Sequence, residues 1–193
     1  MKITKLCVIL ALVVGCNSWL VATPENESSI EVLLLKQMDE ERMAFRLYTE
    51  LGKVHTHMKP FQNIPRAENR HFNALAEYAK ANFPEIEIAG LESEFQFAAT
   101  QQLYAAWLEK GKTSRQAAAE VGVELEKLDI ADIDHFLAQK PDAELTAILE
   151  NLKAGSQKHL AAFQRHSSGG SGKGRMKGKG NSVKQSCCGR SHK

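Results

Sequence analysis

The stretch IPRAENRHFNALAEY, residues 64–78, decides the fold that this sequence predicts. Ile64, Glu68, His71, Leu75 and Tyr78 follow one another at alternating steps of four and three residues. That spacing places side chains on one side of a helix, where a bundle buries them. Two of the five side chains are ionisable, so we expect this helix to carry a carboxylate and an imidazole into the core.

Three other segments share this spacing, and each apolar stripe is interrupted near its middle by polar side chains. The stripes run from Leu34 to Leu51, from Ala119 to Phe136 and from Leu145 to Phe163. The interruptions are Glu41 in the first stripe, Glu126 and Asp129 in the second, and Ser156 and His159 in the third. The alternation typical of strands is absent, and Pro and Gly stand where helices should end.

These patterns predict an all-α domain over residues 30–166. Four long helices are expected at about 29–52, 63–82, 114–139 and 142–166, with an extra short helix at about 93–109 between the second and the third. Asn63 is expected to cap the second long helix, and Thr113 or Ser114 the third. Short links within each pair of long helices favour an antiparallel four-helix bundle.

Carboxylates that meet inside such a core need partners, because an unpaired buried charge is strongly destabilising. We expect no Lys or Arg on the stripes at that level, so divalent cations are the predicted counter-charges. The four cysteines stand at positions 7, 16, 187 and 188, which leaves no thiolate for the core. Carboxylate and imidazole ligands suit iron, manganese or zinc.

Other polar residues on or beside these stripes are expected to have structural roles. Asp39 and Glu40 are expected to be surface charges. His55 and His57 are expected to face solvent in the first link. Tyr48 is expected to pack in the core.

The motifs, taken together, resemble the ferritin-like superfamily of di-metal carboxylate bundles, and Glu41–Ala44 with Tyr48 is similar to the first helix of rubrerythrin-type proteins. More closely, the chain resembles a prokaryotic family known as domain of unknown function 2202, over about residues 30–165. The matching stretches are Asp39–Ala44 with Tyr48, Ile64 with Glu68–His71, Val121–Gly122 with Glu126 and Asp129–Asp132, and Glu150–Leu152 with Gly155–Ser156 and His159–Leu160.

The superfamily resemblance implies a ferritin-like bundle that binds two metal ions, chiefly iron, with manganese or zinc as alternatives. It takes one Glu from each of two helices and a Glu-x-x-His from each of the others. The implied ligands are Glu41 and His71 on one ion, Glu68 as a bridge, and Glu126, Asp129 and His159 around the other ion. Ser156 departs from the pattern, because the superfamily has a Glu there, and Asp129 is the expected replacement.

Three functions remain open at this point. The first is an oxidoreductase of the ferroxidase or peroxidase kind, which reacts with O2 or peroxide or oxidises Fe(II). The second is a metal-binding or sensing module of the cell envelope without turnover, which the missing carboxylate at Ser156 favours. The third is a bundle with a vestigial site that binds a partner.

The N-terminal residues predict export to the periplasm or cell envelope. Lys2 and Lys5 precede an apolar run over residues 6–14, which is too short to span a membrane. Val13–Cys16 resembles a lipobox, in which Cys16 would carry a lipid anchor in the membrane; the alternative is ordinary signal cleavage near Ala22. We expect residues 1–22 to be a signal peptide and residues 23–29 a tether.

The C-terminal residues predict a disordered tail. Residues 167–193 hold seven basic residues and no acidic ones, among Gly and Ser. Such a tail is expected to contact an anionic surface such as lipid or polysaccharide, and nucleic acid is the least expected partner of an exported protein. Cys187 and Cys188, with His192, are compatible with a metal site, a strained disulfide or an inert end.

Overall fold

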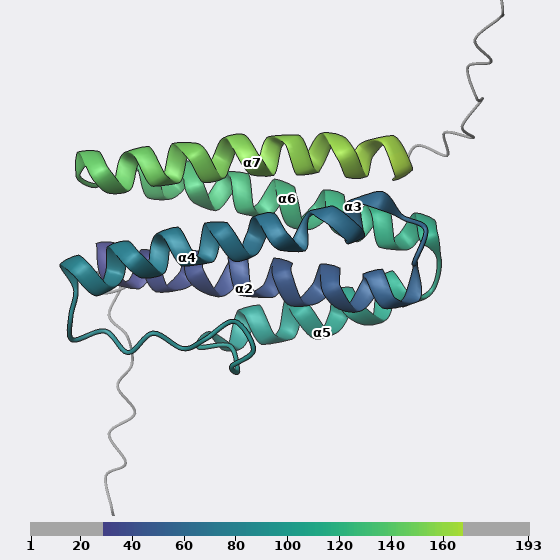
Figure 1. The fold of residues 1–193 in the computed structure, drawn as a ribbon, viewed down its shortest axis with the longest axis horizontal. Coiled ribbons are helices and arrows are strands. Elements are labelled where there is room, and N and C mark those ends of the chain that lie inside the picture. The colour runs from purple at the N-terminus through teal and green to yellow at the C-terminus, as the bar shows by residue number, and fades with distance from the viewer. Residues whose placement is uncertain (1–28, 168–193) are drawn as a thin grey trace, which may run out of the picture.

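The computed structural model describes residues 29–167, and this part of the chain is helical without strands (Figure 1). The helices are α2 (Ile30–Val54), α3 (Lys59–Asn63), α4 (Pro65–Asn82), α5 (Ala98–Lys112), α6 (Arg115–Ala138) and α7 (Ala143–Ser167). The all-α prediction is confirmed, as is a shorter helix between the second and third long ones. The predicted signal peptide, Cys16, the tether up to residue 28, and the tail from residue 168 with Cys187 and Cys188 lie outside the described residues.

Two helix hairpins form the bundle. α2 and α4 pack against each other, as do α6 and α7, and α5 lies against α2 and α6 (Figure 1). Residues 55–64, which include α3, join α2 to α4, and residues 139–142 join α6 to α7, so the two helices of each hairpin run in opposite directions. No helix in the described range is both long and apolar enough to cross a membrane.

Local side chains explain several helix ends. The Oγ of Ser29 accepts a hydrogen bond from the Val32 N–H at the start of α2, and Ser114 Oγ accepts one from Ala117 at the start of α6. The prediction that Asn63 caps α4 is wrong, because Asn63 is the last residue of α3. Pro65 opens α4 instead, where its missing N–H costs no hydrogen bond.

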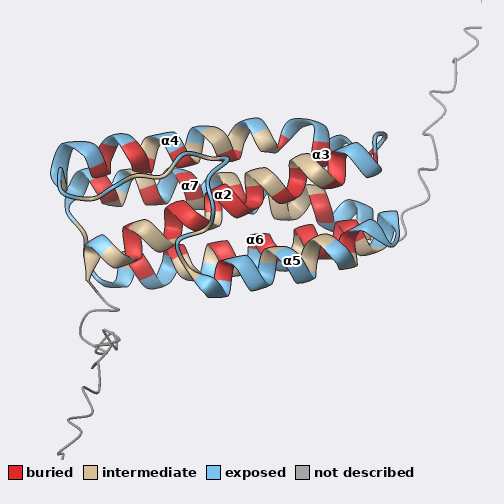
Figure 2. Cartoon of the chain, turned by 90° about the horizontal axis from the view of Figure 1, so that it is seen from below, coloured by how far each residue is buried: buried red, intermediate tan, exposed pale blue. Residues whose placement is uncertain are grey.

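The apolar core is divided into two blocks by a polar layer. One block contains Met38, Leu75, Ile133 and Leu149, and the other contains Met43, Leu47, Leu125 and Phe163. On each long helix, the residues between the two blocks include the ionisable members of its stripe. Figure 2 shows that the buried residues face the interior of the bundle along its whole length.

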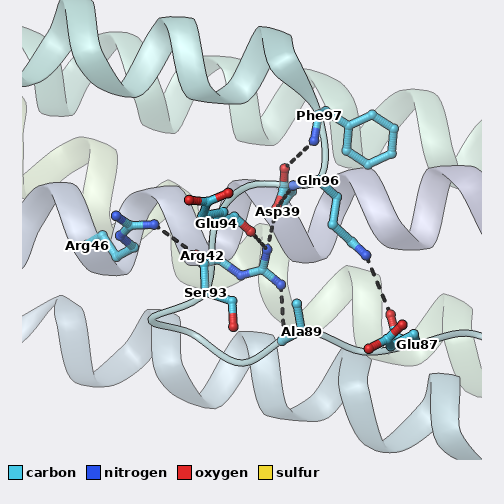
Figure 3. Close-up of polar contacts among 9 residues, drawn as sticks. All are labelled: Asp39, Arg42, Arg46, Glu87, Ala89, Ser93, Glu94, Gln96 and Phe97. Atoms are coloured by element: carbon cyan, nitrogen blue, oxygen red, sulfur yellow. Dashed lines mark hydrogen bonds and ion pairs between the residues drawn. The ribbon is translucent and has the colours of Figure 1, made fainter.

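The connector of residues 83–97 is tied to α2 by a buried ion pair (Figure 3). The Arg42 Nη1 donates to Asp39 Oδ1 at 2.6 Å and to the carbonyl oxygen of Glu94 at 3.1 Å, and Nη2 donates to that of Ala89 at 2.9 Å. Asp39 also accepts hydrogen bonds from the backbone N–H groups of Gln96 and Phe97. The expectation of a surface Asp39 is therefore wrong, because its carboxylate satisfies the donors at the start of α5.

Two other expectations need correction. α5 begins at Ala98 rather than near Ser93, because the residues before it make these connector contacts. His55 is buried, and its Nε2 lies 2.8 Å from the Gly111 carbonyl oxygen, so it joins the first link to α5. His57 is exposed, as expected.

Candidate metal centre

Five ionisable side chains from four helices meet in the polar layer between the two apolar blocks. α2 contributes Glu41, α4 contributes Glu68 and His71, α6 contributes Glu126, and α7 contributes His159. Each stands on the stripe that the alternating spacing predicts. The three Glu side chains are at most 2% exposed, so they meet in an interior that water hardly reaches.

These side chains form two groups that share Glu68. In the first group, His71 Nδ1 lies 3.2 Å from Glu41 Oε2 and 3.0 Å from Glu68 Oε2. In the second, His159 Nδ1 lies 2.9 Å from Glu68 Oε1 and 3.7 Å from Glu126 Oε1. The two oxygens of Glu68 therefore face opposite histidines, so that one carboxylate links the two groups.

The residues of both groups fit metal ions. Within each group, the ligand atoms lie within 4.8 Å of one another. Metal–ligand bonds of about 2.1 Å place neighbouring ligand atoms about 3.0 to 3.4 Å apart, close to the observed separations. Glu41 Oε1 is buried without a hydrogen bond, and Glu68 Oε1 and His159 Nδ1, buried 2.9 Å from each other, form an ion pair but make no other hydrogen bond. Such atoms are rare in folded proteins, and a metal ion would satisfy them.

Asp129 is not part of either group, although it was an expected ligand. Gln37 Nε2 donates to its Oδ1 at 2.6 Å, which holds the carboxylate on the α2 side of the layer. Ser156 is buried, and its Oγ donates to the Leu152 carbonyl oxygen at 3.1 Å. The Asp129 carboxylate therefore lies beside Ser156 and Gln37 but outside both ligand groups of the described residues.

The electrostatics of the metal-free site show how it balances its charges. Burial lowers the pKa of His71, but the carboxylates of Glu41 and Glu68 outweigh burial and raise that pKa to about 11. Burial likewise lowers the pKa of His159, and Glu126 and Glu68 raise it to about 10. Both histidines are therefore imidazolium ions at neutral pH without metal. The sequence predicted metal ions as the counter-charges of the buried carboxylates. Without metal, the imidazolium ions of His71 and His159 fill that role.

The pKa values of the carboxyl groups shift in opposite directions: that of Glu68 is lowered, and those of Glu126 and Glu41 are raised. Burial raises the pKa of Glu68, but the close approach of His159 and His71 lowers it to about 2. Burial raises the pKa of Glu126 to about 8, with a further contribution from the charge of Glu68. Burial and the charge of Asp129 raise the pKa of Glu41 well above its ordinary value. A metal ion that bound here would therefore displace protons.

Three residues around the site support its geometry. The Tyr48 hydroxyl is fully buried and donates to Glu126 Oε1 at 2.8 Å, so its role exceeds core packing. Gly155 faces the imidazole of His71: a Cβ there would lie 2.7 Å from Cε1 and Nε2. Gln37 fixes Asp129. The sequence signal for Gly155 was a glycine in the middle of a helix, where it needs a packing reason.

Comparisons with known proteins agree with this architecture. The chain is 31% identical over 136 residues to the uncharacterized protein MJ0754 of Methanocaldococcus jannaschii, a match that covers 68% of this chain and 71% of that protein. The crystal structure of hypothetical protein MJ0754 from Methanococcus jannaschii DSM 2661 superposes with a TM-score of 0.66 at 29% identity, and covers 76% of this chain and 82% of that one. The family model of the uncharacterized protein domain DUF2202 matches residues 29–174. The chain therefore belongs to the DUF2202 family.

Proposed function

We propose that this protein is an exported di-metal carboxylate protein of ferritin-like architecture. Its two ions, chiefly iron, would bind between Glu41, Glu68, His71, Glu126 and His159. Its reaction would be with O2 or peroxide, or the oxidation of Fe(II). The observation that carries the proposal is the shared Glu68, whose two oxygens each face the histidine of a different ligand group.

The chain's own residues would set the conditions for this chemistry. Iron would supply the Fe(II)/Fe(III) couple, which no amino-acid side chain in the layer offers. Glu68 would hold both ions at a fixed separation, and Tyr48 would orient Glu126 through its hydrogen bond. The apolar blocks on both sides of the layer would exclude water, which strengthens the electrostatic interactions inside.

Anaerobic loading with Fe(II) followed by exposure to air tests this proposal. We expect two iron ions per chain and a near-ultraviolet charge-transfer absorption that develops on oxidation. Glu68→Ala should lose both, because Glu68 belongs to both ligand groups. Glu77→Ala is the matched control, since Glu77 is exposed on the same helix. Iron binding that survives in Glu68→Ala would contradict the proposal.

A second function is a metal-binding or sensing module without turnover. The observation that favours it is Ser156, which brings a hydroxyl where a second bridging carboxylate would stand. This function predicts stoichiometric zinc or manganese and no acceleration of the oxidation of added Fe(II). Iron oxidation by air, measured with and without the protein, separates the two functions. A vestigial site predicts no metal at all and unchanged thermal unfolding after chelation.

The export proposal rests on residues 1–22 and is tested separately from the metal centre. A full-length chain expressed in a bacterium should reach the envelope fraction. If Cys16 carries a lipid, Cys16→Ser should move the protein from the membrane to the soluble fraction. If cleavage occurs near Ala22, the substitution should have no effect. Removal of residues 168–193 should weaken binding to anionic vesicles if the tail contacts such a surface.

A further inference from the structure

The two histidines mark the side on which the metal centre approaches the surface. The side chain of His71 is 14% exposed and that of His159 is 12% exposed, whereas those of Glu41 and Glu68 are only 2% and 3% exposed. His71 stands on α4 and His159 on α7, two helices that pack side by side (Figure 1), and their ring centroids lie 5.8 Å apart. The centre therefore comes nearest to solvent at the seam between α4 and α7.

Small side chains flank the histidines along this α4–α7 seam. The Cε1 and Nε2 atoms of His71 face Gly155, which stands four residues before His159 on α7. Because an α-helix turns about 100° per residue, the residues four before and three after a given residue lie on the same edge of its face. These residues are Ala67 and Ala74 beside His71, and Gly155 and Ala162 beside His159, all partly exposed. They bring nothing larger than a methyl group to the seam.

Two cations stand at the outer edge of the seam. Arg70 and Lys158 are each the chain neighbour of a site histidine, both are exposed, and neither forms an ion pair within residues 29–167. On α4, Phe72 lies 5.6 Å from the Arg42 guanidinium of α2, so Arg70, about 200° away around the helix, is turned from α2 toward the seam. On α7, Lys158 follows Gly155 by three residues and shares its edge of the helix. Both long side chains can therefore extend over the seam.

The two ligand groups leave each ion able to bind a further ligand. Each group provides three side chains, with Glu68 counted in both. Catalytic zinc sites and non-haem iron sites with three protein ligands keep positions open for water or substrate. The Oε1 of Glu41 is buried without a hydrogen bond, so the layer also has a polar atom that the protein does not satisfy. Apolar blocks close the layer at both ends, so an external ligand would reach the ions past the histidines.

We propose that the α4–α7 seam admits a small anion to the metal centre, with Arg70 and Lys158 as the residues that attract it and Ala74 and Ala162 as residues that limit its size. This inference rests on the proposed function, and it names the reactant class of that centre as inorganic anions of a few atoms. Cations at the edge of the seam raise the local concentration of anions. The exposed carboxylate of Glu77 lies seven residues beyond Arg70, about 10 Å along the helix axis, and offsets this field only in part.

Titration of the full-length, Co(II)-loaded protein with sodium azide tests this route. Azide is a linear anion of three atoms, and the visible absorption of Co(II) changes when an external ligand binds, whether or not any reaction follows. The test variant is Arg70→Gln with Lys158→Gln. The matched control is Arg115→Gln with Lys80→Gln, which removes one Arg and one Lys at exposed positions away from the seam. A second test variant, Ala162→Leu, narrows the seam without a change of charge.

We expect the wild type and all variants to hold two Co(II) ions per chain, and azide to change the wild-type absorption in a saturable way. The dissociation constant for azide should rise about tenfold in Arg70→Gln with Lys158→Gln and stay at the wild-type value in the matched control. Ala162→Leu should also weaken azide binding, because the larger side chain enters the seam. Benzoate, whose ring is too large for a seam lined by methyl groups, should leave the absorption unchanged.

Several outcomes would overturn the inference, and they differ in what else they affect. Equal azide affinity in the test variant and the wild type removes Arg70 and Lys158 from the route, and an equal loss in the matched control reduces their effect to net charge. Unchanged azide binding in Ala162→Leu, or binding of benzoate, contradicts the size limit. Fewer Co(II) ions in a test variant make its residues part of the ligand geometry instead.

The wild type alone separates this inference from the proposed function. A wild-type protein that holds two Co(II) ions but does not respond to azide refutes the route and leaves the metal centre intact. A wild-type protein that binds no Co(II) removes both the route and the proposed function.

Discussion

Gly155→Ala should separate metal binding from folding. The Cβ that this substitution adds would lie 2.7 Å from Cε1 and Nε2 of His71, whereas ordinary van der Waals contact begins at 3.4 Å. The imidazole must therefore move by about 0.7 Å, the difference between these distances. Metal–ligand distances tolerate only about 0.2 Å. We expect one of the two ions to bind about 10- to 100-fold more weakly, equivalent to about 1.4–2.8 kcal/mol.

The stability of the metal-free protein should change little, because two effects oppose each other. Ala stabilises a helix interior by about 1 kcal/mol relative to Gly, and the contact with His71 offsets this gain. Calorimetric titration with Mn(II) would measure the affinities, and urea unfolding with chelator present would measure stability. Gly111→Ala is the control, because its Cβ would meet the Leu51 methyl carbons at 2.8 Å instead of a proposed ligand. Two ions bound to Gly155→Ala with wild-type affinity would refute His71 as a ligand in this orientation.

Three further predictions follow from contacts in and around the polar layer. Tyr48→Phe removes the hydroxyl that donates to Glu126 Oε1. Urea titration of the metal-free protein should then show a free energy of unfolding lower by about 1–3 kcal/mol. An unchanged free energy of unfolding would mean that the hydrogen bond contributes nothing. Asp39→Ala leaves the buried Arg42 without its carboxylate and should lower the free energy of unfolding by about 3–5 kcal/mol. Hydrogen exchange at the Phe97 N–H should become faster, because Asp39 accepts its hydrogen bond. Unchanged exchange would contradict the role of Asp39 at the start of α5. The unfolding temperature of the metal-free protein should fall as pH rises from about 5 to 9. The raised pKa values of His71 and His159 stabilise the folded protein fully below about pH 6.5, and this contribution is lost as the pH rises toward 10–11. The pKa of Glu126 is about 8 in the folded protein and about 4.5 in the unfolded chain, so deprotonation of this group favours unfolding above about pH 4.5. Bound metal should remove most of this dependence in calorimetry, and a metal-free protein most stable at pH 9 would refute the assignment.

Much of the polar layer was predictable from helical periodicity. A spacing of three and four residues is a property of one helix, so the sequence identifies which face of each long helix is buried without knowledge of its neighbours. Glu41, Glu68, His71, Glu126 and His159 were expected on those faces, and the structure brings all five together.

Contacts between distant segments were not predictable in this way. Asp129 stands on the same stripe as Glu126, yet Gln37 from α2 holds it outside both ligand groups. Asp39 looked like a surface charge because the backbone N–H groups that bind its carboxylate lie 57 and 58 residues further along the chain. Its burial depends on the path of residues 83–97, of which 93–97 were expected to belong to the short helix that in fact begins at Ala98.

The sequence by itself determined that this chain forms helices whose buried faces carry carboxylates and imidazoles, because the period of a helix and the chemistry of its side chains are local properties. Only the tertiary structure decided that Glu68 faces His71 with one oxygen and His159 with the other. It also decided that Gly155 leaves room for the His71 ring. Such relations depend on how far each helix is rotated and shifted along its axis against partners far away in the sequence. That alignment is fixed by the packing of the whole core.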